Sequence, residues 1–173
     1  MELRKIAVFS MLLAMGIVLH IVEGMIPPPL PFPGAKLGLS SIVVFFTMLY
    51  LGYREGVLLA VLRSILGGLI GGTFLTVGFF LSLGGATVSA LVMALVLQFG
   101  RRWFSLIGVS VIAAVSHNVT QLAIVLTFFV KQNALLYYLP FLLIVATVSG
   151  MLTGLVMVYL EGRMDRLQYG PQP

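Results

Sequence analysis

The segment LIGVSVIAAVSHNVTQLAIVLTFFV, from Leu106 to Val130, decides the class of this protein. It contains no Asp, Glu, Lys or Arg, and a transmembrane helix needs about 20 predominantly apolar residues. The segment therefore predicts a membrane-spanning helix. Its centre is unusual, because His117, Asn118 and Gln121 stand where the surrounding sequence favours leucine.

The composition of the whole chain agrees with a membrane protein. The chain is 60% hydrophobic and 9% charged, with a mean hydropathy of +1.14, whereas a soluble domain is about 45–50% apolar and about 25% charged. It has no Cys, which excludes a disulfide framework or a thiolate metal site. The net charge is +5, but Lys and Arg are scattered between apolar segments, so membrane topology explains them better than nucleic-acid binding.

The apolar segments predict an all-α, polytopic membrane protein of six transmembrane helices, which form one membrane domain over residues 1–173. No small-x-small cleavage site follows the first segment, so we expect a retained helix and not a signal peptide. A cytoplasmic N-terminus places seven Lys and Arg inside, two outside and one within a span. This bias predicts that both termini are cytoplasmic. The expected helices are 6–22, 37–51, 56–71, 74–99, 106–130 and 139–160, with a cytoplasmic tail over 161–173.

The polar residues of the fifth segment have two interpretations. His117 and Gln121 are four residues apart and share a helix face, with Asn118 beside them. His117 lies roughly 16 Å from Leu106 along a helix, near the membrane midplane. These side chains could form hydrogen bonds between helices. Three polar groups within five residues favour the other interpretation, a polar cavity that binds a solute.

Arg63 is the one basic residue inside a predicted span. A charge at that depth costs about 2.5–3.5 kcal/mol unless it reaches the interface or finds a partner. Arg63 could extend its side chain to the inner surface, or it could pair within the bundle. No acidic residue is an obvious partner for it near the midplane, because Glu23 belongs to the outer end of the first helix.

Three further residues gather at the predicted outer surface. His20 and Glu23 are three residues apart at the end of the first helix, and Lys36 begins the second. They are either interfacial anchors or groups at the mouth of a pocket. The connection between the helices, GMIPPPLPFPG over 24–34, has five prolines. We expect an ordered outer loop that acts as a lid, with a passive interfacial loop as the alternative.

Small residues recur at helical spacing in three segments. Such patterns let helix backbones approach closely within a membrane. In the third and sixth segments, with Gly67 and Gly71 and with Gly150 and Gly154, packing inside the bundle is the simplest interpretation. In the first segment the small face could instead pack against another subunit. That face consists of Ala7, Ser10 and Ala14.

The chain resembles a known family over most of its length, from Arg4 to Leu160. The similarity rests on KLGL at 36–39, R-x-x-L-G at 63–67 and HN-x-x-Q at 117–121. The family is the bacterial Gx transporter family, labelled heptaprenyl diphosphate synthase component I. It is similar to the S components of energy-coupling factor transporters, six-helix proteins of the bacterial cell membrane.

The resemblance also implies partners. An S component works with a transmembrane coupling subunit and two cytoplasmic ATPases, and the face formed by Ala7, Ser10 and Ala14 would contact the coupling subunit. In this chain Met11 and Val18 interrupt the fuller small-residue pattern of that face. No Walker A sequence is present, so ATP would have to be hydrolysed by the partners.

The synthase label does not predict catalysis by this chain. Prenyl chain elongation needs Mg²⁺ held by carboxylates, and the only Asp of the sequence is Asp165 in the tail. We therefore expect no enzyme activity, no catalytic residue, no metal and no cofactor.

The sequence predicts a subunit that captures a vitamin-like molecule or a cofactor precursor from outside for an ATP-driven importer. The alternative is a non-catalytic scaffold subunit linked to prenyl diphosphate or quinone metabolism. The predicted solute-binding residues are His20, Glu23, Lys36, Arg63, His117, Asn118 and Gln121.

Overall fold

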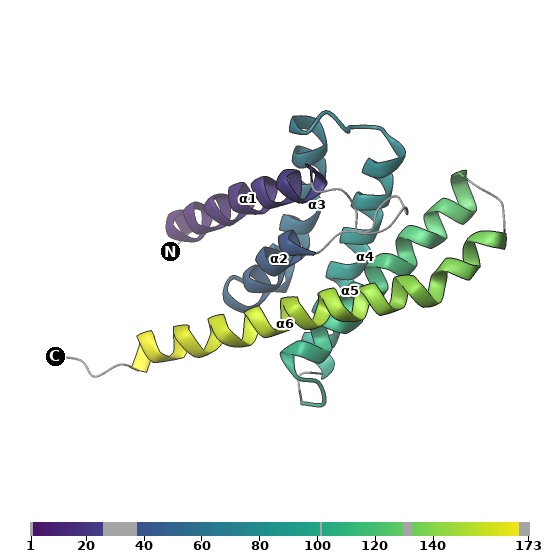
Figure 1. The fold of residues 1–173 in the computed structure, drawn as a ribbon. Helices are drawn as coiled ribbons and strands as arrows, with labels where there is room; N and C mark the ends of the chain where they lie inside the picture. The colour runs from purple at the N-terminus through teal and green to yellow at the C-terminus, as the bar shows by residue number, and fades with distance from the viewer. Residues whose placement is uncertain (1, 26–37, 101, 130–132, 170–173) are drawn as a thin grey trace.

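The computed structural model describes residues 2–25, 38–100, 102–129 and 133–169, and these segments are built from helices (Figure 1). A π-helix, η1 (Val125–Phe129), continues α5, and a 3-10 helix, η2 (Asn133–Tyr138), leads into α6. The Lys36 position and the proline-rich connection lie outside the described residues. The α-helices are α1 (Glu2–Met25), α2 (Leu39–Tyr50), α3 (Tyr53–Ile70), α4 (Val77–Gly100), α5 (Leu106–Ile124) and α6 (Leu139–Tyr169).

Four of these helical segments are long and apolar enough to cross a membrane. They are Leu3–Met25, Val77–Gly100, Leu106–Phe129 and Leu139–Met164. Helix α2 is apolar but has only 12 residues, and the 18-residue helix α3 includes Arg54, Glu55 and Arg63. The all-α, multi-pass class is thus confirmed, whereas six complete spans stay a prediction.

The helix boundaries differ from the predicted ones at α1, α4 and α6. The fourth helix was expected from residue 74 but begins at Val77, because the preceding turn uses positive φ angles at Gly72 (68°) and Leu75 (62°). The Thr76 hydroxyl then accepts a hydrogen bond from the Phe79 amide at 3.3 Å, as an N-terminal cap does. Helices α1 and α6 extend beyond the expected limits, to Glu2 and Tyr169.

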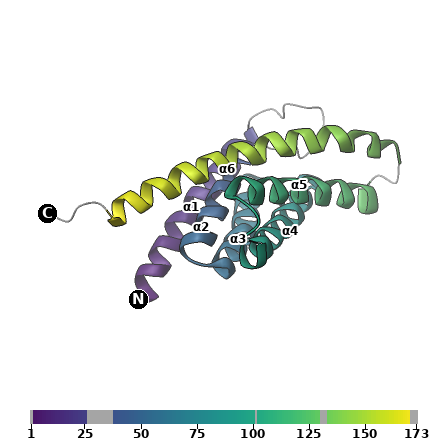
Figure 2. The same cartoon turned by 90° about the horizontal axis from the view of Figure 1, so that it is seen from below.

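Each α-helix packs against the next one in the chain. The α5–α6 pair makes the largest contact, helices α1, α2 and α3 pack mutually, and α2 also touches α6. Figures 1 and 2 show the N- and C-termini at the same end of the molecule. We call this end the terminal end; its location in the cytoplasm stays a prediction.

Glycines bring the backbones of α5 and α6 into direct contact. A Cβ atom at Gly150 would lie 2.7 Å from Val111 Cα, and one at Gly154 would lie 2.5 Å from Ile107 Cα. Real Cβ atoms do not approach that closely, so only glycine fits at both positions. The packing interpretation of this pair is therefore confirmed.

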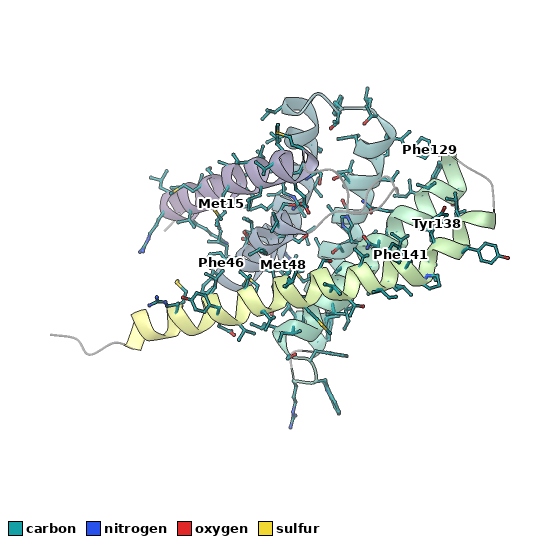
Figure 3. All side chains as sticks on the ribbon, in the orientation of Figure 1. Met15, Phe46, Met48, Phe129, Tyr138 and Phe141 are labelled. Atoms are coloured by element: carbon teal, nitrogen blue, oxygen red, sulfur yellow. The ribbon has the colours of Figure 1, made fainter. Side chains whose placement is uncertain are left out.

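The distribution of side chains on α4 is that of a membrane helix with a polar interior. Ser82 and Ser89 are buried, whereas Val88, Leu91 and Leu95 are exposed on the opposite side. Exposed apolar side chains at helical spacing suit contact with lipid. At the far end of the α5–α6 pair, Figure 3 shows the aromatic side chains of Phe129, Tyr138 and Phe141.

A compact apolar core fills the bundle toward the terminal end. Phe45 and Met48 of α2 are at most 1% exposed and pack with residues of α3, α4, α5 and α6. This core closes the bundle on one side of the polar residues described next. Its other fully buried members include Leu59, Leu97, Val109 and Met157.

Candidate solute-binding site

A small polar cavity lies inside the bundle, and every one of the six α-helices contributes to its wall. It has about 40 Å³ open to the centres of water-sized molecules, which is room for more than one water. The predicted site residues that line it are His20, Glu23, Arg63, His117 and Asn118. Five residues chosen from three separate segments of sequence thus meet in one place.

Arg63 is buried in the cavity wall, with 3% of its surface exposed. Its Nε and Nη1 atoms have no hydrogen-bond partner within the described part of the chain. The side chain passes across Gly16 of α1, where a Cβ atom would lie 3.4 Å from Arg63 Cδ. The first interpretation, in which Arg63 reaches the inner surface, is therefore wrong, because the guanidinium stays inside the bundle.

Glu23 is the carboxylate that interacts electrostatically with Arg63, but its oxygens are held by α2. It accepts hydrogen bonds from the Gly38 amide and from Ser40 Oγ, the latter at 3.1 Å. Gly38 has a φ of 81°, a conformation that glycine adopts without strain. An acidic group is stabilised at a helix N-terminus, so Glu23 joins α1 to the start of α2 while it faces the cavity.

Each of the two histidines of the cavity packs against a glycine of a neighbouring helix. A Cβ atom at Gly67 of α3 would lie 2.7 Å from His20 Cδ2. A Cβ atom at Gly85 of α4 would lie 3.0 Å from both Cε1 and Nε2 of His117. Both imidazoles line the cavity, and each has interactions within the protein. The glycines therefore set how far the rings project into the cavity.

The polar residues of α5 differ in their position relative to the cavity. Asn118 lines the cavity but also donates a hydrogen bond from Nδ2 to the Leu142 carbonyl of α6 at 3.3 Å. Gln121 is buried next to Gly85, and its Nε2 has no partner among the described residues. It lies beside the cavity and is not part of its wall. Asn118 thus serves in part as a link between helices, and a binding role for Gln121 stays a prediction.

Hydroxyl groups line much of the cavity, and none of them was among the predicted site residues. Ser110 Oγ is buried without a partner among the described residues, whereas Ser89 donates a hydrogen bond to the Ala113 carbonyl of α5 at 2.8 Å. Helical spacing is a signal that could have revealed these hydroxyl residues, because Ser82 and Ser89 of α4 are seven residues apart and Ser149 and Thr153 of α6 are four apart. The hydroxyl residues of the wall are Ser40, Ser41, Ser82, Ser89, Ser110, Ser149 and Thr153.

The predicted partner face lies on the outside of the molecule. Ala7, Ser10 and Ala14 are all exposed on α1, which is the least buried of the four candidate spans. Their contact with another subunit stays a prediction. Within the described residues, no three His, Asp or Glu side chains are grouped as metal ligands.

The comparisons with known proteins agree with the resemblance read from the sequence. The family model described as heptaprenyl diphosphate synthase component I matches residues 12–160. The chain belongs to this family. No curated protein and no solved structure matches it. The matched range includes all of the cavity-lining residues.

Proposed function

We propose that this member of the heptaprenyl diphosphate synthase component I family is the substrate-binding subunit of an ATP-driven importer of the energy-coupling factor type. It would capture a small polar molecule, such as a vitamin or a cofactor precursor, from outside a bacterial cell. The observation that carries the proposal is the cavity lined by buried Arg63, whose Nε and Nη1 have no hydrogen-bond partner in the described part of the chain.

A structural role alone accounts poorly for Arg63. A buried donor without a partner costs about 1–3 kcal/mol, and an apolar residue would pack at the same position without that penalty. A solute that accepts hydrogen bonds would remove the penalty when it binds. The hydroxyl groups around the cavity, among them Ser110 and Ser149, supply additional donors and acceptors for such a solute.

Transport by this subunit requires partners, and α1 offers a surface for them. Ala7, Ser10 and Ala14 would let a helix of the coupling subunit approach closely. Ser10 is exposed and does not line the cavity, so a large side chain at this position would act on this contact alone. We expect the two ATPases to bind the coupling subunit.

The experiment is affinity purification of the tagged protein from bacterial membranes, followed by identification of the co-purified subunits. Ser10→Leu should abolish co-purification of the coupling subunit and the ATPases, whereas Ser10→Ala, which keeps the residue small, should retain them. Normal co-purification with Ser10→Leu, or no ATPase partner with the unmodified protein, would contradict the proposal.

A second candidate function, a non-catalytic membrane scaffold linked to prenyl diphosphate or quinone metabolism, is favoured by two contacts. The hydrogen bonds from Asn118 to Leu142 and from Ser89 to Ala113 join helices, as expected if the polar residues serve packing. A scaffold would bind no solute in the cavity. Retention of a small molecule therefore distinguishes the two functions.

A further inference from the structure

A second, larger cavity lies beside the polar one, toward the start of α4. It has about 270 Å³ open to the centres of water-sized molecules and lies between α1, α3 and the turn before α4. His20 and Ser82 line both cavities, so the two spaces border each other at these side chains. We call the first space the polar chamber and the second the glycine chamber.

Glycines and two aromatic rings shape the wall of the glycine chamber. Gly67 and Gly68 of α3 make room for the rings of His20 and Phe79, each of which would lie 2.7 Å from a Cβ atom at the glycine it faces. Phe79 packs edge-on against Phe74, with 4.8 Å between ring centroids. Rings in the wall of a cavity suit a flat, partly apolar group.

The polar chamber is suited to a different part of a molecule. It is small, and it is lined by Arg63 and Ser110, which are 3% and 2% exposed and have hydrogen-bonding atoms without a partner among the described residues. The carboxylate of Glu23 is already engaged by two donors of α2. A compact anionic oxygen group would accept from Arg63 and from Ser110 and would also balance the buried positive charge.

We infer that the two chambers bind one elongated molecule, with a compact anionic oxygen group at Arg63 and Ser110 and a flatter, larger body in the glycine chamber. The body would pass His20 and Ser82, which both chambers share. This inference rests on the proposed function and names the chemical class of its solute. The anionic group is a carboxylate or a phosphate monoester, since both present the oxygen acceptors that a guanidinium binds.

The test is thermal unfolding of the purified protein in detergent with a bacterial metabolite extract as the probe. The extract is divided by anion exchange into a retained, anionic fraction and an unretained fraction. A molecule that binds the folded state raises the unfolding midpoint. The anionic fraction should raise it by at least about 2 °C, and this shift should be lost in Arg63→Gln and reduced in Ser110→Ala, which keeps the charge.

A matched pair of variants tests the glycine chamber. Gly78→Leu adds a large side chain to a residue of the chamber wall without a backbone clash, because the nearest atom to a Cβ there is Thr76 Oγ1 at 3.8 Å. It should reduce the shift. Gly162→Leu on α6, where a Cβ atom meets nothing within 4 Å and which lines neither chamber, should preserve it.

The possible failures are distinguishable. Stabilisation by the unretained fraction, equal in the unmodified protein and in Arg63→Gln, would overturn the inference and leave the proposed function standing. A full shift in Gly78→Leu would overturn the assignment of the glycine chamber. No shift with either fraction would contradict the proposed function itself. If Arg63→Gln does not fold, the inference is tested by Ser110→Ala and Gly78→Leu, and an undiminished shift in both variants would overturn it.

Discussion

Replacement of Arg63 by methionine should make the ligand-free protein more stable while it abolishes solute binding. Met is unbranched and can follow the Arg side chain as far as Nε, without a charge. The position is 3% exposed, and Nε and Nη1 have no partner among the described residues. The substitution therefore removes two unsatisfied donors and a buried charge and keeps the packing around the aliphatic part of the side chain.

The magnitude follows from the contacts that are lost and gained. Two unsatisfied buried donors cost about 2–6 kcal/mol together, at about 1–3 kcal/mol each. The loss of the attraction to Glu23 opposes this gain, although that carboxylate keeps its hydrogen bonds to Gly38 and Ser40. Replacement of buried ions by apolar residues of similar volume has stabilised proteins by about 1–4 kcal/mol. We expect a net increase in the free energy of unfolding within that range.

The assay is reversible unfolding by sodium dodecyl sulfate in mixed micelles, without added solute. Arg54→Met on the same helix is the matched control, because Arg54 is exposed and its loss should change stability by no more than about 0.5 kcal/mol. A decrease of more than about 1 kcal/mol in Arg63→Met, in the range of a lost buried interaction, would refute the reasoning. It would show that Arg63 is a paired structural residue.

Three further predictions concern the glycines and the ion pair at the terminal end. Gly85→Ala should displace the His117 ring, since the new Cβ would lie 3.0 Å from it, and a binding titration should show at least about tenfold weaker solute binding, equivalent to 1.4 kcal/mol. Gly154→Leu should separate α5 from α6 and lower the unfolding midpoint; an unchanged midpoint would disprove their close packing. The hydrogen bond from Lys5 lowers the pKa of Glu55, so its contribution to stability is present above the ordinary Glu pKa and is lost as pH falls through the lowered value. Unfolding midpoints of Glu55→Gln and the unmodified protein should differ at pH 7 and converge in acid, and a constant difference would contradict this.

The fold class was predictable because a membrane leaves few choices. Long uncharged segments such as 106–130 must form helices there, since helices satisfy every backbone hydrogen bond internally. The start of α4 was mispredicted because Leu75 takes a positive φ. That conformation is rare for a residue with a side chain, so the sequence gives no local sign of it.

The site was predictable in part. Helical periodicity grouped His117 with Asn118 on α5, and both line the cavity together with Ser110. Periodicity does not say how far along a helix face a cavity extends, and Gln121 lies beyond its end. The serines were overlooked because small hydroxyl residues are also common where membrane helices pack together, so their presence does not by itself indicate a binding site. The path of Arg63 depends on Gly16 of another helix, a tertiary contact that no local pattern reports.

Binding of a small molecule in the polar cavity can be measured by native mass spectrometry. The unmodified protein and Arg63→Met would be extracted gently from bacterial membranes, incubated with the same bacterial metabolite extract and released from detergent in the spectrometer. We predict a bound small molecule on the unmodified protein and none on Arg63→Met. An unmodified protein without a bound molecule, or one that is bound equally by the variant, would contradict the account.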